Sequence, residues 1–282
     1  MFHNIRNRTT FGRGIVATFA LILTLGLGLS VTAAAAASDR HDLQSPNPTI
    51  VFVHGGWADS SSWNQEVTNL ERLGYPVIAP ANPLRDLAAD SAYIRSVLQT
   101  ISGPIVLVSH SYGGAVITNA AVGVPNVKAL VYIAAFAPDK GESLVQLVTM
   151  NPGSQIGPAT LDFRPYPLPG GGTGIDLYIK KSAFHDAFAG DLPLNVTDQM
   201  QATQRPFSNE AFVAPSGEPA WKTIPSWYMV ATQDHAIPPA TERFMAQRAH
   251  ATTVEVDSSH VAMISQPEAT TRLILAAANS IR

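Results

Sequence analysis

The chain has 282 residues, of which 46% are hydrophobic and 14% are charged. That composition is typical of a folded globular protein and excludes a disordered or collagen-like polymer. The formal net charge of −3 gives no electrostatic basis for binding a nucleic-acid backbone. The absence of cysteine excludes disulfides, thiolate metal sites, a cysteine nucleophile and the lipid-bearing cysteine of a lipoprotein.

The first 37 residues have the pattern of a secretory signal peptide. Three arginines within the first 13 residues precede an uncharged apolar run (15–29), and residues 32–37 end in the small side chains that signal peptidase prefers. The uncharged stretch 14–38 is long enough to span a bilayer, so a retained anchor is the alternative. We expect cleavage near Ala37 and export of residues 38–282 to the periplasm or the medium, with no stable membrane association afterwards.

Apolar runs of five to nine residues alternate with helix-like periods after residue 48. This alternation is typical of a single α/β domain, with a mostly parallel sheet of about six strands and helices on both faces. The predicted strands are Thr49–His54, Tyr75–Ala79, Pro104–Ser109, Val127–Ala134, Ser226–Ala231 and Thr252–Val256.

Four segments carry apolar residues at helical spacing. The first extends from Trp63 to Leu73, and we predict a capping box of Ser62 and Gln65 at its start and a stop at Gly74. The other three cover Ile94–Ile101 and the stretches that begin at Pro238-Pro239 and at Pro267.

Residues 139–223 interrupt this regular pattern. Asn151–Gly174 holds five prolines and six glycines in 24 residues, and the whole segment has no clear strand signal. Because strand-like runs resume afterwards, we interpret 139–223 as a cap inserted into the α/β domain. A mobile surface excursion is the alternative.

Ser111 stands at a junction that favours nucleophilic chemistry. A predicted buried strand runs into the sequence Ser109-His110-Ser111-Tyr112-Gly113 and then into an alanine-rich helix. A serine on a sharp strand-to-helix turn holds its hydroxyl clear of the sheet, where it can attack a carbonyl carbon. Ser109 occupies the first position of the usual G-x-S-x-G pattern. We predict that Ser111 is a nucleophile.

A serine nucleophile needs a general base within hydrogen-bond reach. His260 follows the last predicted strand and therefore lies at the carboxyl edge of the sheet, where sites on α/β folds occur. His110 precedes the serine in the turn and is interpreted as pointing elsewhere. We predict that His260 is the base.

The base in turn needs a carboxylate to orient it. Asp234 follows the strand Ser226–Ala231 and gives the chain order serine, aspartate, histidine. Asp139, which follows an earlier strand, and Asp257, three residues before His260, are the alternatives.

An acyl-transfer site also needs N–H donors for the oxyanion, each typically worth about 10²–10³ in rate. The backbone N–H groups of Tyr112 and of Gly56, in the turn His54-Gly55-Gly56-Trp57, are the candidates. No histidine–carboxylate cluster has metal-ligand spacing and no glycine-rich loop matches a nucleotide site, so we expect no cofactor.

Four aromatic side chains are weaker candidates for lining a substrate pocket, with packing in the core as the equal alternative. They are Trp57, Phe136, Phe184 and Phe188.

Four blocks of the chain resemble the α/β-hydrolase superfamily, in the branch of bacterial esterases related to plant methylesterases and hydroxynitrile lyases. They are VFVHGGWADSSSW (51–63), LVSHSYGG (107–114), VYIAAFAPD (131–139) and TQDHAIP with SSHVAM (232–238 and 258–263). The resemblance covers nearly all of 49–282 and implies the α/β-hydrolase fold. Carried over by position, it assigns the triad to Ser111, Asp234 and His260 and the oxyanion amides to Gly56 and Tyr112.

Two positions narrow the activity that this resemblance implies. Val261 stands where the hydroxynitrile lyases have a lysine, and Ser111 stands where dehalogenases and epoxide hydrolases have an aspartate. We therefore expect an exported serine esterase that cleaves a small-molecule carboxylic ester through an acyl-enzyme. The alternatives are a hydroxynitrile-lyase-like or cofactor-free haloperoxidase-like enzyme on the same triad, and a non-catalytic ligand-binding relative.

Overall fold

The computed structural model describes residues 47–282, so the predicted signal segment lies outside the described residues. Within 47–282, no helix combines the length and the apolar character needed to cross a bilayer. Six parallel strands form the main sheet in the order β2-β1-β3-β4-β8-β9. Their bounds are β1 (Thr49–Val53), β2 (Val77–Ile78), β3 (Ile105–Ser111), β4 (Val127–Ala135), β8 (Ser226–Ala231) and β9 (Thr252–Val256). The predicted fold class is confirmed.

Continuous burial explains why the strand runs could be recognised in the sequence. Every residue of β1, β3 and β8 is buried, because helices cover both faces of the sheet at these positions. The two edge strands differ, since β2 has only two paired residues and β9 is largely exposed.

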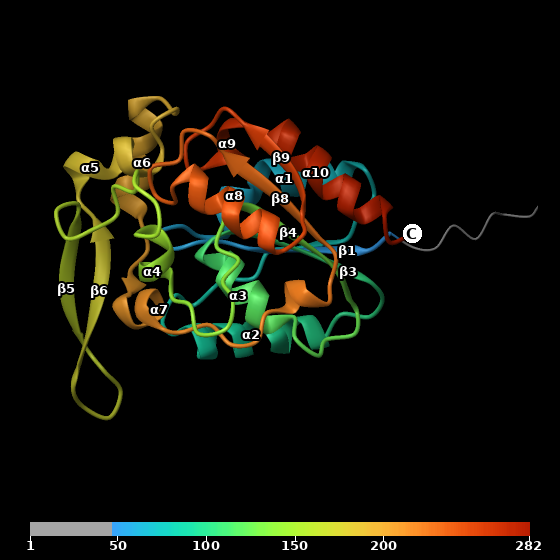
Figure 1. Cartoon of the computed structure of the whole chain (residues 1–282), viewed down its shortest axis with the longest axis horizontal. Helices are drawn as coiled ribbons and strands as arrows, with labels where there is room; N and C mark the ends of the chain where they lie inside the picture. Colours follow the sequence, from blue (N-terminus) through green and yellow to red (C-terminus); the bar gives the residue numbers. More distant parts are fainter. Residues whose placement is uncertain (1–46) are drawn as a thin grey trace, which may run out of the picture. The chain divides into compact units, whose positions relative to one another are not determined.

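The helices form layers on the two faces of the sheet (Figure 1). On one face α1 (Asn64–Arg72) packs against α10 (Pro267–Asn279), which also contacts β4 and β8. On the other face α3 (Tyr112–Ala120) packs against β3 and against α2 (Leu87–Gln99). Two further helices, α8 (Pro239–Arg248) and α9 (Ala262–Ser265), follow the last two strands.

The first helix starts within one residue of its predicted start, but the predicted capping box is wrong. A 3₁₀ turn, η1 (Ser60–Trp63), precedes α1, and the side chain of Asp59 caps it by accepting the N–H of Ser61 at 2.8 Å. Ser62 donates to the backbone oxygen of Asp59 instead of forming a capping box with Gln65. The chain turns early because an aspartate is a good N-cap acceptor.

Most of the segment between β4 and β8 gathers at the carboxyl ends of the parallel strands, and its last part returns past α3 to the start of β8 (Figure 1). It contains the helices α4 (Leu144–Val148), α5 (Lys181–Phe188), α6 (Leu194–Thr203) and α7 (Asn209–Val213), the turn η2 (Ala220–Lys222) and the strands β5 (Leu161–Pro167), β6 (Thr173–Ile179) and β7 (Phe207–Ser208). We refer to these elements as the cap.

The expectation that this segment lacks strands is wrong. β5 and β6 form an antiparallel hairpin that β7 extends to a three-stranded sheet. Pro165 and Pro167 lie in β5, which is an edge strand and so tolerates residues without an N–H donor. Three consecutive glycines, 170–172, have positive φ and form the turn. The prolines and glycines that hid the strands in the sequence therefore mark an edge and a tight turn.

Candidate active site

Ser111 lies on a strained turn at the end of β3. Its φ of +50° and ψ of −126° are rare for a residue with a side chain, and such strain typically costs about 1–3 kcal/mol. The surrounding sheet holds the turn, since β3 lies between β1 and β4 and the N–H of Phe136 donates to the Ser111 carbonyl at 3.1 Å. Strain of this kind is concentrated at functional sites.

Close backbone contacts explain the glycines that flank this turn. A Cβ atom on Gly113 would lie 2.3 Å from the carbonyl oxygen of Val53, and one on Gly55 would lie 2.6 Å from Cβ of Ser111. Only residues without side chains therefore allow α3 and the loop after β1 to meet at the serine.

We expect Gly113→Ala to lower the free energy of unfolding by about 1–3 kcal/mol, because the new methyl group would overlap a backbone oxygen that cannot move away. Gly157→Ala is the matched control, since a Cβ there has no atom within 4 Å and the backbone is not left-handed. The control should change stability by less than about 0.5 kcal/mol in urea denaturation. Equal stability of the two variants would contradict this account.

The structure brings Asp234 and His260 together. Nδ1 of His260 lies 2.5 Å from Oδ2 of Asp234, and both side chains are buried. Oδ1 of Asp234 accepts the backbone N–H groups of Ala236 at 2.6 Å and Ile237 at 2.9 Å. Because an ionised carboxylate only accepts hydrogen bonds, the imidazole proton belongs on Nδ1. Nε2 then carries the lone pair that a general base needs.

The structure does not join Ser111 to this pair by a hydrogen bond. Nε2 of His260 is buried and has no hydrogen-bond partner within residues 47–282. Hydrogen bonds between a nucleophile and its base often tighten only in the complex with substrate. The third contact of the predicted triad therefore remains a prediction.

The two alternative acids lie elsewhere. Asp139 forms an ion pair with Lys222, at 2.8 Å between Oδ1 and Nζ, and the hydrogen bond from Lys222 lowers the pKa of that carboxyl. Asp257 is exposed on its loop. Of the three candidate carboxylates, Asp234 is the one that contacts the imidazole of His260.

His110 lies against His260 and does not point away as the sequence suggested. Its ring centroid is 4.6 Å from that of His260, and its Nε2 is 2.9 Å from the His260 carbonyl oxygen. Burial lowers the pKa of His110 well below its usual value, so the ring is neutral and Nε2–H donates this bond. His110 therefore anchors the backbone of the predicted base. Its position next to Ser111 at the end of a strand was the feature of the sequence that could have indicated a place in the site.

The two predicted oxyanion residues line the same pocket as Ser111. Gly56 lies in the loop after β1 and Tyr112 at the start of α3. The Tyr112 hydroxyl donates to Asp90 on α2 at 2.8 Å, which ties its side chain to a neighbouring helix. The hydroxyl of Tyr112 is therefore already engaged, and the group predicted to bind the oxyanion is its backbone N–H.

His54 shapes the loop that carries Gly56. Its Nε2 accepts the N–H of Asn82 at 2.9 Å, so the proton lies on Nδ1, which is 3.0 Å from the Gly55 carbonyl oxygen. Burial lowers the pKa of His54 to about 4, and the ring is neutral at physiological pH. This histidine therefore acts as a structural clamp on the loop.

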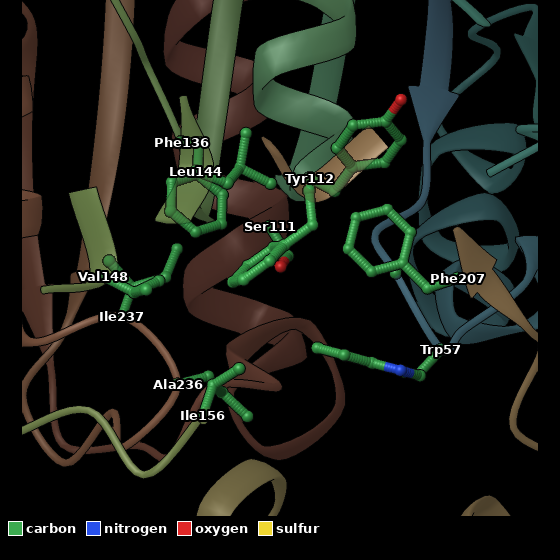
Figure 2. Close-up of a pocket in the computed structure, with 12 residues that line it drawn as sticks. Trp57, Ser111, Tyr112, Phe136, Leu144, Val148, Ile156, Phe207, Ala236 and Ile237 are labelled. Carbon is green, nitrogen blue, oxygen red and sulfur yellow. The ribbon is translucent and has the colours of Figure 1, made fainter. Parts of the chain in front are cut away.

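Ser111 faces a small apolar pocket (Figure 2). Its free volume of about 10 Å³ is room for about one water molecule. Trp57 and Phe136 line this pocket. Their contact with a substrate stays a prediction. The remaining lining comes from Gly56, Tyr112, Leu144, Val148, Ile156, Phe207, Phe212, Ala236 and Ile237.

Phe184 and Phe188 lie outside the Ser111 pocket. They line a second hollow of about 150 Å³ between the cap and η1. Trp57 lines both spaces, and its Nε1 donates to the carbonyl of Leu177 on β6 at 2.9 Å. The Phe188 ring also lies 5.1 Å from that of His260, so it packs against the predicted base. Within the described residues no cluster of three metal-binding side chains occurs.

Comparison with known proteins gives the family. A sequence model described as "Alpha/beta hydrolase family" matches residues 50–273, and the chain belongs to that family. Part of the chain is 33% identical, over 112 residues, to a carbendazim-hydrolyzing esterase of Nocardioides sp. (strain SG-4G); the match covers 35% of this chain and 46% of that esterase, about half of its length. The predicted resemblance to this superfamily and to its esterases is confirmed.

Two longer matches cover most of the chain. A probable hydrolase of Phoma sp. (strain ATCC 20986 / MF5453) is 24% identical over an alignment of 242 residues, and the match covers 78% of this chain and 94% of that protein. The crystal structure of polyneuridine aldehyde esterase superposes with a TM-score of 0.70 at 20% identity, covering 82% of this chain and 98% of that one. At that identity the superposition establishes the shared fold.

Proposed function

We propose that this protein is a serine esterase that cleaves small-molecule carboxylic esters. The proposal is supported by the buried Asp234–His260 pair, whose Nε2 has no partner within residues 47–282, and by the strained turn at Ser111, whose neighbour His110 packs against the His260 ring. Esterases among the relatives support an ester as the substrate class. The apolar walls of the pocket suit an uncharged acyl or alcohol group.

In the proposed reaction His260 takes the proton of the Ser111 hydroxyl as its Oγ attacks the ester carbonyl carbon. The C–O bond to the alcohol then breaks, and His260 returns the proton to the departing alcohol. Asp234 keeps the imidazole in the required tautomer and stabilises it while it is charged. The N–H groups of Gly56 and Tyr112 stabilise the oxyanion. Water activated by His260 releases the acid and restores the serine.

A fluorophosphonate probe and p-nitrophenyl esters test this proposal directly. We expect covalent labelling of Ser111 in the folded protein and turnover of short-chain esters. Folded protein without a label would favour a ligand-binding relative. Release of cyanide from a cyanohydrin without ester hydrolysis would favour a lyase, which Val261 after the predicted base disfavours.

We further propose that the enzyme is exported, on the basis of the signal-like pattern in residues 1–37. Expression of the full chain in a bacterial host should yield mature protein that begins near residue 38 in the periplasm or the medium. Intact protein in the cytoplasm would contradict export, and intact protein in the membrane would favour the anchor.

A further inference from the structure

A buried acid that the proposed reaction does not use lies beside Asp234. Glu242, on α8, is 0% exposed. Its Oε2 accepts the backbone N–H of Ala231 at 3.1 Å, at the end of β8 and three residues before Asp234. Its Oε1 is also buried and has no partner if both oxygens are acceptors. The carboxyl group of Glu242 lies within hydrogen-bond reach of that of Asp234.

Within residues 47–282, no lysine or arginine forms an ion pair with either of these two carboxyl groups. Arg243 is next in the chain, but its guanidinium pairs with Glu255 at the surface, with N–O distances of 2.7 and 2.8 Å. Tyr228 faces the pair from β8, and its hydroxyl donates to the carbonyl of Ala135 instead. The remaining titratable neighbour is His260, on the other oxygen of Asp234. Two negative charges packed together in a dry core are costly, so one carboxyl group must hold a proton.

The hydrogen bonds identify which carboxyl group is protonated. Asp234 already accepts three N–H donors, from Ala236, Ile237 and His260, and these favour its charged form. Glu242 accepts one. Burial, and then the charge of Asp234, hold the pKa of Glu242 well above its usual range. A proton on Glu242 also allows its carboxyl group to donate to Asp234, so that the two groups no longer meet as acceptors only.

We propose that Glu242 is a positioning residue that acts through Asp234, donating a hydrogen bond from its protonated carboxyl group to the Asp234 carboxylate. This fourth donor fixes the orientation of the carboxylate that holds His260. The role of this bond in turnover rests on the proposed esterase function, whereas the bond itself does not.

Three variants test the proposal: Glu242→Gln, Glu242→Leu and the control Glu66→Leu. The amide of Gln can accept from Ala231 and donate to Asp234, whereas Leu can do neither. Glu66 on α1 is equally buried, with both oxygens unpartnered in the described part of the chain, so no hydrogen bond there joins it to Ser111, Asp234 or His260. It therefore controls for the loss of any buried acid.

We expect Glu242→Gln to keep kcat within about threefold and to leave the acid limb of the kcat/KM pH profile in place, since no charge is lost. Glu242→Leu should lower kcat by about 10- to 100-fold with little change in KM, the size of one lost hydrogen bond to a charged group. Glu66→Leu should leave both parameters unchanged. If Glu242→Gln moves the acid limb to lower pH by about one unit or more, Glu242 was ionised and the proposal is wrong.

A second measurement does not depend on ester turnover. The far-downfield proton NMR resonance of the His260 Nδ1–H reports the hydrogen bond to Asp234. We expect it to persist in Glu242→Gln and Glu66→Leu and to shift or disappear in Glu242→Leu. An unchanged resonance in Glu242→Leu would overturn the positioning role. Expected NMR behaviour in a protein without esterase activity would overturn the proposed function alone. If Glu242→Leu does not fold, the pH profile of Glu242→Gln still decides.

Discussion

Ser111→Ala is expected to lower kcat for ester hydrolysis by about 10⁴–10⁶ with little change in stability. The methyl group cannot attack a carbonyl carbon, and no other nucleophile is placed on the strained turn at the end of β3. Alanine differs from serine by one oxygen atom and carries the same Cβ on the strained turn, so we expect the fold to persist. Rates with p-nitrophenyl esters measure the loss, and chemical denaturation measures the stability.

Ser109→Ala is the matched control for this prediction. Ser109 lies two residues earlier on β3, is buried, and donates to the carbonyl of Val131 at 3.1 Å, away from the reaction. We expect it to cost about 1 kcal/mol of stability and to leave kcat unchanged. A Ser111→Ala enzyme that keeps more than a tenth of the wild-type rate, or that is still labelled by the fluorophosphonate probe, would refute the nucleophile assignment.

The main sheet could be predicted from the sequence because the pattern of apolar residues within each strand marks that strand. A strand buried on both faces, such as β8, reads as an unbroken apolar run, and β8 has its predicted bounds. β9 also has its predicted bounds, although it is a largely exposed edge strand. The cap could not be predicted in this way. In β5 only Leu161 is buried, and the two prolines are tolerated because the strand lies at the edge of its sheet and pairs with β6 alone.

Some residues of the candidate site could be predicted from the sequence, and others could not. The positions of Ser111, Asp234 and His260 after strand ends follow from the chain order that parallel sheets impose. The sequence favoured Asp234 and kept Asp139 as an alternative, because both follow a strand; the contact between Asp234 and His260 could be found only in three dimensions. His110 was misread for the same reason: its hydrogen bond spans 150 residues of sequence, and no local pattern records it.

Asp234→Asn is expected to lower kcat by about 10⁴, the size associated with presenting the wrong histidine tautomer in serine proteases. Oδ1 of Asp234 is held by the N–H groups of Ala236 and Ile237. In the variant the amide oxygen must take that place, since an NH₂ group there would meet two donors. The NH₂ group then faces Nδ1 of His260 and donates to it, so the imidazole proton moves to Nε2.

An imidazole that carries its proton on Nε2 has no lone pair to accept the proton of Ser111. The variant should therefore bind ester with nearly unchanged KM but turn it over slowly. Asp139→Asn is the control, because that carboxylate pairs with Lys222 and lies on the other candidate loop; it should retain activity within about twofold. A large loss in Asp139→Asn together with normal rates in Asp234→Asn would assign the orienting role to Asp139. Since Asn has nearly the size of Asp and can keep both backbone hydrogen bonds, loss of activity in Asp234→Asn would reflect the position of one proton.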